Sequence, residues 1–424
     1  MAMDAEELKR RRQERKAQRQ QARKRLTVRL CIAGVILLLC AVLIIGFASR
    51  SRQEPSNTPT VPPQTTLPTQ PEETLPDETQ PPVTVIHFAA AGDLNVTEKV
   101  VASGDAAYDY TQTFLDVAYL LADADLACVN FEGNLCGAPY GSNASAPQSM
   151  MTALKSAGVD MIQLANSYSI NRGVSGLITT IDSVYQAGME PVCVFQDQAD
   201  YNRKQGFSLF EVEGVRVAVV SFTKGMDGTT LPPGNEHCVN VLYTDYDSTY
   251  QKVDKQRITQ VLDNVAKAQP DITIALLHWG SEYNDTVSKS QQSITSLMHE
   301  LGVDAIIGTH SHYVQQVEFD PEQGTLVAYS LGDFIGDAER SGSEYSIILD
   351  LEITKDNLTG TASITGYDYT PVFTVAEEGK PLRVVRIAEA VKAWEDGFMD
   401  TVTQQTYEKM TYALTRAKER VEGK

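Results

Sequence analysis

Short apolar runs alternate with longer amphipathic stretches along the chain from residue 83 onward. The runs are rich in Val, Ile, Leu and Ala, which is typical of strands that are buried on both faces. They cover residues 83–91, 124–131, 159–165, 190–195, 215–222, 271–278, 303–308 and 325–331. The stretches that separate several of the runs fit helices and cover residues 112–122, 175–188, 254–268 and 288–301. The alternation predicts an α/β fold.

Two regions depart from this alternation. The segment VEGVRVAVV and the runs between Ser343 and Thr370 have the pattern of hairpins, so the sheets are predicted to be mixed. The chain from Ile387 onward is amphipathic with a helical period. We therefore expect one domain over residues 83–385 and a helical C-terminal segment over residues 386–424.

The N-terminal part of the chain has a different pattern. Residues 1–29 hold 11 Lys or Arg but only 4 Asp or Glu, and residues 30–48 contain no charge. A helix of that length, at ~1.5 Å per residue, crosses the ~30 Å hydrocarbon core of a bilayer. The basic flank places the N-terminus in the cytoplasm and the main domain outside the cell, on a single-pass anchor. A cleaved signal peptide is the alternative, but the apolar run is long for one and no small-x-small site follows it directly.

The residues between the anchor and the domain are predicted to form a tether. Residues 49–82 are mostly Pro, Thr, Gln, Glu and Ser without apolar periodicity, which is typical of a disordered linker. Beyond residue 29 the chain carries 25 basic and 51 acidic residues, a net charge of −26, which argues against nucleic acid as a partner. The cysteine spacing suggests neither a zinc ribbon nor a dense disulfide framework, and a pair between Cys136 and Cys238 stays open.

Polar residues follow several of the predicted strands. Ligands of α/β sheets bind beyond the carboxyl ends of strands, and three of the six histidines fall there. The candidate metal ligands at these ends are Asp93, Glu132, His278, His310 and His312. Their oxygen and nitrogen atoms are of the kind that hold Mn, Fe or Zn, as one or two ions. On an extended segment, His310 and His312 would face the same side and contact one metal or two neighbouring metals.

Each of these residues has an ordinary explanation when it is taken alone. Gly92-Asp93 after a strand is often a turn, Glu132 can be a loop carboxylate, and His278 can be a satisfied core histidine. Their occurrence together at successive strand ends favours a shared polar site, and it favours an intact metal centre less strongly.

The order of the strand-end motifs resembles that of the CapA family of bacterial capsule and poly-γ-glutamate synthesis proteins. The matching motifs are Gly92-Asp93, VNFEGNL, LANSYSINRG, HWGSEY, GTHSHYVQQVE and YSLGDF, which together span roughly Val85 to Ile335. The resemblance implies a fold related to the calcineurin-like metallophosphoesterases, an αββα sandwich of mixed sheets. It also implies a cell-surface protein with a dinuclear metal site. Asp333 stands where the family usually has Asn.

The resemblance assigns roles residue by residue. Asp93 matches the family's first-strand aspartate, Asn130 and Glu132 its Asn-x-Glu motif, and His278 and Glu282 its His-Trp-Gly-x-Glu-Tyr motif. The histidines at 310 and 312 match its His-x-His motif. Asn166, Tyr168 and Glu282 are the candidate catalytic residues, with Asn166 expected to orient substrate or bound water.

The stretch LANSYSINRG departs from the family pattern. The family usually has Ala-Asn-Asn-His followed by Asp-x-Gly, whereas Ser167 and Tyr168 occupy the Asn-His positions here and Asn171 replaces the Asp. In the related phosphoesterases the Asn-His pair gives one metal ligand and one proton donor. A serine is a weaker ligand, and a phenol with an ordinary pKa near ~10 is poorly matched to acid-base work at neutral pH.

Two functions therefore stay open. The first is a membrane-anchored, metal-dependent hydrolase or transferase that acts in capsule or poly-γ-glutamate synthesis or export, on an exopolymer, a polyglutamate amide or a phosphoester. The second is a catalytically lapsed surface subunit that binds the anionic exopolymer or the polyglutamate synthase components in the membrane. A serine hydrolase is disfavoured because the chain has no Gly-x-Ser-x-Gly motif.

Overall fold

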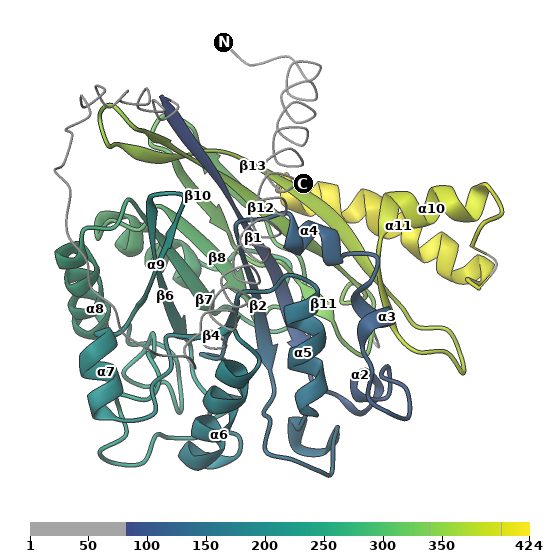
Figure 1. Ribbon diagram of the computed structural model, residues 1–424, viewed down its shortest axis with the longest axis horizontal. Coiled ribbons are helices and arrows are strands. Elements are labelled where there is room, and N and C mark those ends of the chain that lie inside the picture. The colour runs from purple at the N-terminus through teal and green to yellow at the C-terminus, as the bar shows by residue number, and fades with distance from the viewer. Residues whose placement is uncertain (1–81, 339, 400) are drawn as a thin grey trace, which may run out of the picture. The chain divides into compact units, whose positions relative to one another are not determined.

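Two β-sheets form the centre of the part of the chain that the computed structural model describes, residues 82–424 except 339 and 400 (Figure 1). The predicted anchor and linker lie outside these residues. Within the described range, no helix is long and apolar enough to cross a membrane.

The first sheet has eight strands in the order β14-β13-β12-β1-β2-β3-β4, with β11 paired to β1. Strands β1 to β4 and β11 run parallel, whereas β12, β13 and β14 pair antiparallel. The strands are β1 Val83–Asn95, β2 Leu126–Glu132, β3 Met161–Gln163, β4 Glu190–Val192, β11 Asp333–Ile335, β12 Tyr345–Asp356, β13 Ala362–Val375 and β14 Arg383–Arg386.

The second sheet has six strands in the order β5-β6-β7-β8-β10-β9. Its four inner strands are parallel, and β5 and β9 pair antiparallel at the two edges. The strands are β5 Ser208–Val212, β6 Val215–Thr223, β7 Ile272–His278, β8 Ala305–Thr309, β9 Val317–Asp320 and β10 Thr325–Ala328. Both sheets are mixed, so the predicted class of mixed α/β sheets is confirmed.

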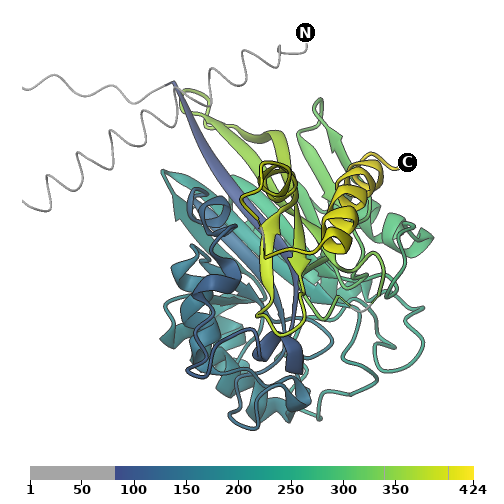
Figure 2. The same ribbon diagram turned by 90° about the vertical axis from the view of Figure 1, so that its right-hand side faces the viewer.

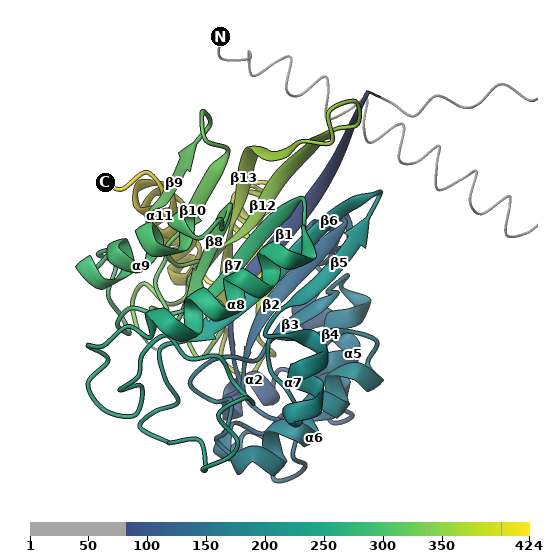
Figure 3. The same ribbon diagram turned by 90° about the vertical axis from the view of Figure 1, so that its left-hand side faces the viewer.

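Three apolar clusters separate the layers. One lies between the sheets and joins residues such as Phe88 and Leu126 to Ile274 of the other sheet. A second packs helices on the outer face of the first sheet, and a third packs α8 and α9 on the outer face of the second (Figure 3). The helices are α2 Glu98–Val101, α3 Thr111–Phe114, α4 Ala118–Ala122, α5 Gln148–Ser156, α6 Gly173–Gln186, α7 Gln198–Lys204, α8 Lys255–Ala268 and α9 Lys289–Glu300. The layers thus follow the order helices, sheet, sheet, helices.

The end of the chain covers the antiparallel part of the first sheet. Helices α10 Ile387–Glu395 and α11 Gln404–Val421 lie beside the long strands β12 and β13 (Figure 2). Their apolar faces, with Ile387 and Met410, join the cluster between the sheets. The helices therefore contribute to that cluster together with the strands.

Most of the predicted strands and helices are present. All eight predicted runs form strands, and both predicted hairpins form antiparallel pairs. The predicted helix over 112–122 is broken into α3 and α4, and α5 and α7 were not predicted. The thiols of Cys128, Cys136, Cys193 and Cys238 are free, so Cys136 and Cys238 do not pair.

Candidate metal centre

The carboxyl ends of strands from both sheets meet at one place and bring all five predicted ligands together. Asp93 and Glu132 come from β1 and β2, His278 ends β7, and His310 and His312 follow β8. All five side chains are buried. With Asp333 at the start of β11, they form two groups in which the potential ligand atoms lie within 4.8 Å of one another.

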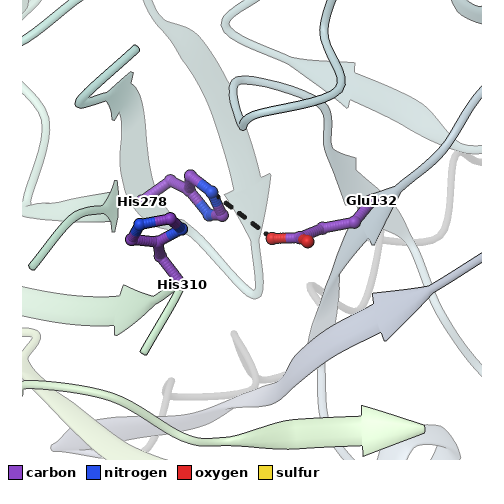
Figure 4. A group of neighbouring side chains, drawn as sticks. All are labelled: Glu132, His278 and His310. Carbon is purple, nitrogen blue, oxygen red and sulfur yellow. Dashed lines mark ion pairs between the residues drawn. The ribbon is translucent and has the colours of Figure 1, made fainter. Parts of the chain in front are cut away.

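We call Glu132, His278 and His310 the His-rich cluster (Figure 4). The Nε2 atom of His278 lies 3.3 Å from Oε1 of Glu132, and its Nδ1 lies 3.1 Å from the Thr309 hydroxyl. The ring of His310 lies next to it, with 4.5 Å between ring centroids. The Nε2 atom of His310 is buried and has no hydrogen-bond partner among the described residues.

We call Asp93, His312 and Asp333 the Asp-rich cluster. Nδ1 of His312 lies 2.7 Å from Oδ1 of Asp333 and 3.8 Å from Oδ2 of Asp93. Burial alone would lower the pKa of His312, but the carboxyl groups of Asp333, Glu132 and Asp93 together outweigh it, and the pKa rises to about 10. This imidazole is therefore a cation that is paired within the protein.

The turn after β8 places the two histidines in different clusters. The predicted extended conformation is wrong, because φ is +90° at His310 and +58° at His312. Such left-handed backbone at a residue with a side chain costs about 1–3 kcal/mol and persists only where surrounding contacts impose it. One such contact is the His310 backbone N–H, which donates to Oδ2 of Asp93 over 3.0 Å.

Close backbone approach also fixes Asp93. A Cβ on Gly92 would lie 1.8 Å from the carbonyl oxygen of Gly332, so only glycine fits there. The Asp93 N–H donates to that same carbonyl over 3.0 Å. The Gly-Asp pair is thus a packing requirement that holds Asp93 beside Asp333.

Two asparagines support the carboxylates. Nδ2 of Asn130 donates to Asp93 over 2.6 Å and lies 3.3 Å from Glu132. Asn166 donates to Asn130 Oδ1 over 3.0 Å and to the Phe131 carbonyl over 2.8 Å, and its own Oδ1 accepts from the Tyr168 N–H. These contacts use both amide hydrogens of Asn166. The side chain, which was predicted to be catalytic, therefore positions Asn130.

The two residues that depart from the family pattern also face the site. The hydroxyl of Ser167 lies 3.2 Å from Nε2 of His278. Partial burial, followed by the charge of Glu132, raises the pKa of Tyr168 to about 12, so the phenol stays neutral. Tyr168 can therefore donate a hydrogen bond at neutral pH but cannot serve there as a base.

Glu282, the third predicted catalytic residue, is exposed at the edge of a cavity of about 250 Å³. Ser167 and His310 line the same cavity, as do Lys224 and Asp227. Lys224 was not predicted from the sequence, although it directly follows β6, where a polar strand end was available as a signal. Asp333 was not among the predicted ligands either.

Burial disfavours the charged forms of most ionisable groups at the centre. Burial is the main cause that raises the pKa of Asp93, to about 6, and the pKa of Glu132 well above its ordinary value. Burial likewise lowers the pKa values of His278 and His310, so both imidazoles are neutral. Among the described residues, the ring of His312 is the cation that pairs with these buried carboxyl groups.

This donor set fits a divalent cation. Buried charges are normally paired or coordinate a metal, and a buried imidazole nitrogen normally has a partner. The Nε2 of His310 lacks such a partner among the described residues, and the carboxyl group of Glu132, which lies 3.3 Å from both Asn130 and His278, belongs to the same cluster. Carboxylate oxygens with imidazole nitrogens suit Mn, Fe or Zn, and the Thr309 hydroxyl orients His278 as a supporting residue does in metal sites.

Two mixed sheets with nitrogen and oxygen ligands at their meeting strand ends define a class of α/β protein with a candidate divalent-cation centre. The family described as bacterial capsule synthesis protein PGA_cap matches residues 87–338. The chain belongs to this family.

Relatives of known name agree with this assignment. Capsule biosynthesis protein CapA of Bacillus anthracis is 26% identical over 306 residues, which are 69% of this chain and 68% of that protein. PGA biosynthesis protein CapA of Bacillus subtilis (strain 168) is 24% identical over 329 residues, 74% of this chain and 81% of that protein. A solved structure, the calcineurin-like phosphoesterase YfkN from Bacillus subtilis, has a TM-score of 0.41 at 15% identity and covers 78% of this chain and 99% of its own.

Proposed function

We propose that this protein acts in the synthesis or export of poly-γ-glutamate or a related capsule polymer, and that its two clusters bind one or two divalent cations. The observation that carries the proposal is the unpartnered Nε2 of buried His310 beside the buried carboxylate of Glu132. The names of the relatives supply the process, since both are described as capsule or PGA biosynthesis proteins.

We further propose a metal-dependent hydrolase or transferase. The two clusters would hold the cation, which would supply a lowered pKa of water and polarisation of a phosphoryl or carbonyl oxygen. The protein's own groups hold the ligands in place: Asn130 fixes Asp93, and Thr309 fixes the ring of His278. Tyr168, neutral at physiological pH, donates a hydrogen bond to a substrate oxygen, and Glu282 meets the substrate at the edge of the cavity.

The proposal extends to location. Residues 30–48 without a charge, behind a basic segment, support a single-pass anchor with the N-terminus in the cytoplasm and the main domain outside. There the domain would meet the anionic polymer and the synthase components in the membrane. Reporter fusions at residue 25 and residue 424 test this topology. A reporter that works only in the cytoplasm would contradict it if it were active when fused at residue 424.

A second function, as a surface accessory subunit without turnover, is favoured by Ser167 and Tyr168 at the Asn-His positions of the family. The two functions separate in one experiment. Chromosomal His310→Ala is compared with wild type for polymer output, and the purified proteins are assayed with Mn²⁺ on γ-glutamyl and phosphoester substrates. The hydrolase predicts that output and turnover are lost together, whereas output that is lost without any wild-type turnover identifies the accessory subunit.

A further inference from the structure

The cavity beside the His-rich cluster contains charges of both signs. Its lining includes Lys224 and Ser167 on the inner side and Asp227 and Glu282 at the exposed edge. Lys224 is half-buried, and its Nζ donates one hydrogen bond, of 2.9 Å, to the Gly280 carbonyl. An ammonium has three N–H donors, so Lys224 retains donors for a ligand.

Tyr250 and Gly280 keep Lys224 in this position. The Nζ atom lies 4.6 Å from the centroid of the Tyr250 ring, which attracts the cation through the electron density of its face. The two acids at the edge repel each other, since the pKa of Asp227 is raised by partial burial and then by the Glu282 carboxylate. An ammonium group between them would relieve this repulsion.

The charges of the lining restrict the ligand class. A purely anionic ligand would meet Asp227 and Glu282 on entry, and a purely cationic one would meet Lys224 inside, so both suffer like-charge repulsion. A ligand with a carboxylate and an ammonium group satisfies both sides. At about 250 Å³ the cavity is smaller than the ~300–1,000 Å³ of usual ligand pockets, so it has room for an end group only.

We propose that this cavity binds the zwitterionic amino end of a γ-linked glutamyl chain, with the α-carboxylate at Lys224 and the α-ammonium at Asp227 and Glu282. The choice of a glutamyl chain rests on the proposed function, whereas the zwitterionic class rests on the lining alone. In a γ-linked chain the first residue keeps both α-groups free, because the side-chain carboxyl forms the amide. In an α-linked chain the α-carboxyl is consumed, and the carboxylate that stays free is two methylene groups farther from the ammonium. The cavity is therefore expected to distinguish the two linkages by the separation of the two charges.

Calorimetric titration of the purified full-length protein in detergent tests this inference. The probes are γ-linked diglutamate, α-linked diglutamate and N-acetylated γ-linked diglutamate, each in both chiralities, with and without Mn²⁺. We expect the γ-linked dipeptide to bind at least tenfold more tightly than the other two. Lys224→Met and Asp227→Asn each weaken it about tenfold, whereas Lys252→Met, at an exposed lysine away from the cavity lining, leaves it unchanged.

If the wild-type protein binds the γ-linked and α-linked dipeptides with equal affinity, or binds neither, the inference is overturned before any variant is measured. Unchanged γ-linked binding in correctly folded Lys224→Met would overturn it as well. Metal content is counted on the same samples, so failure of the proposed metal centre is seen separately. If the protein binds the γ-linked dipeptide but no metal, this inference stands and the proposed metal-dependent activity fails. If it binds metal but not the dipeptide, this inference fails and the proposed metal centre stands.

Discussion

The two ligand clusters lie side by side but differ in how their charges are satisfied. In the Asp-rich cluster, the imidazolium of His312 pairs with Asp333 at 2.7 Å, so the proton on His312 makes an ion pair within the cluster. In the His-rich cluster both imidazoles are neutral, and the Nε2 of His310 has no partner among the described residues. The first arrangement is complete without a metal, whereas the second is not.

This difference predicts an order of metal binding. A cation at the His-rich cluster gains the unpartnered Nε2 of His310 and displaces the proton that burial favours on Glu132, whereas a cation at the Asp-rich cluster must displace the proton of His312 from its ion pair with Asp333. We therefore expect a tight site at the His-rich cluster and a weaker, pH-dependent site at the Asp-rich cluster. Asp333, which stands where the family usually has Asn, would be the cause of that weakness.

The largest expected effect is the loss of the tight site in His310→Ala. Removal of a ligand from a buried cluster is expected to weaken Mn²⁺ or Zn²⁺ binding at least 100-fold, since even supporting residues cost ~10–100-fold. The measurement is a competitive titration against a chelator with fluorescent readout. His299→Ala, a histidine of α9 outside the site, is the matched control. Retention of the tight site in His310→Ala would mean that the tight site is not at the His-rich cluster.

The second effect is the pH dependence of the weaker site. It is measured in His310→Ala, where the Asp-rich cluster remains. With a pKa of about 10, His312 is protonated throughout pH 7–9, while Asp93, with a pKa of about 6, is already charged. One proton must therefore leave, and the affinity is expected to rise about tenfold for each pH unit across this window. A flat profile would show that His312 carries no proton there.

The third effect concerns Asp333→Asn. Because Asp333 is the main partner that raises the pKa of His312, its neutralisation is expected to lower that pKa by at least one unit. The pH dependence of metal affinity then becomes shallower between pH 7 and 9. The imidazole signals of His312 in the metal-free protein give the pKa directly by NMR. Asp350→Asn, which removes the partner of His87 elsewhere on the first sheet, controls for general charge effects. An unchanged pKa would assign the shift to other groups.

The smallest effect is expected from Ser167→Ala. The hydroxyl makes one 3.2 Å contact with Nε2 of His278. A single such hydrogen bond contributes about 1 kcal/mol, so its removal is expected to lower metal affinity roughly fivefold. Ser167→Asn, which restores the family residue, is expected to shift metal affinity in the opposite direction. Ser175→Ala, on the exposed face of α6, is the control. A change above about 100-fold would make Ser167 a principal ligand.

The sequence was sufficient for the sheets and for the gathering of the ligands. Buried strands have a clear apolar signature, and parallel strands bring their carboxyl ends to one edge, so polar residues after separate strands converge. The division into two clusters was not predictable, because it depends on the left-handed backbone at His310 and His312. That conformation is supported by a hydrogen bond from His310 to Asp93, which is 217 residues away in the chain. Lys224 was not predicted, because its place after the strand that ends at Thr223 is the only signal for it and a lysine there is also common on ordinary surfaces.

The most direct test of the central claim is the metal content of the purified full-length protein, measured by elemental analysis after growth with Mn, Fe and Zn. The account predicts one to two equivalents per chain in wild type and at least one equivalent fewer in His310→Ala. Wild-type protein without a bound metal, or His310→Ala with the full wild-type content, would contradict it.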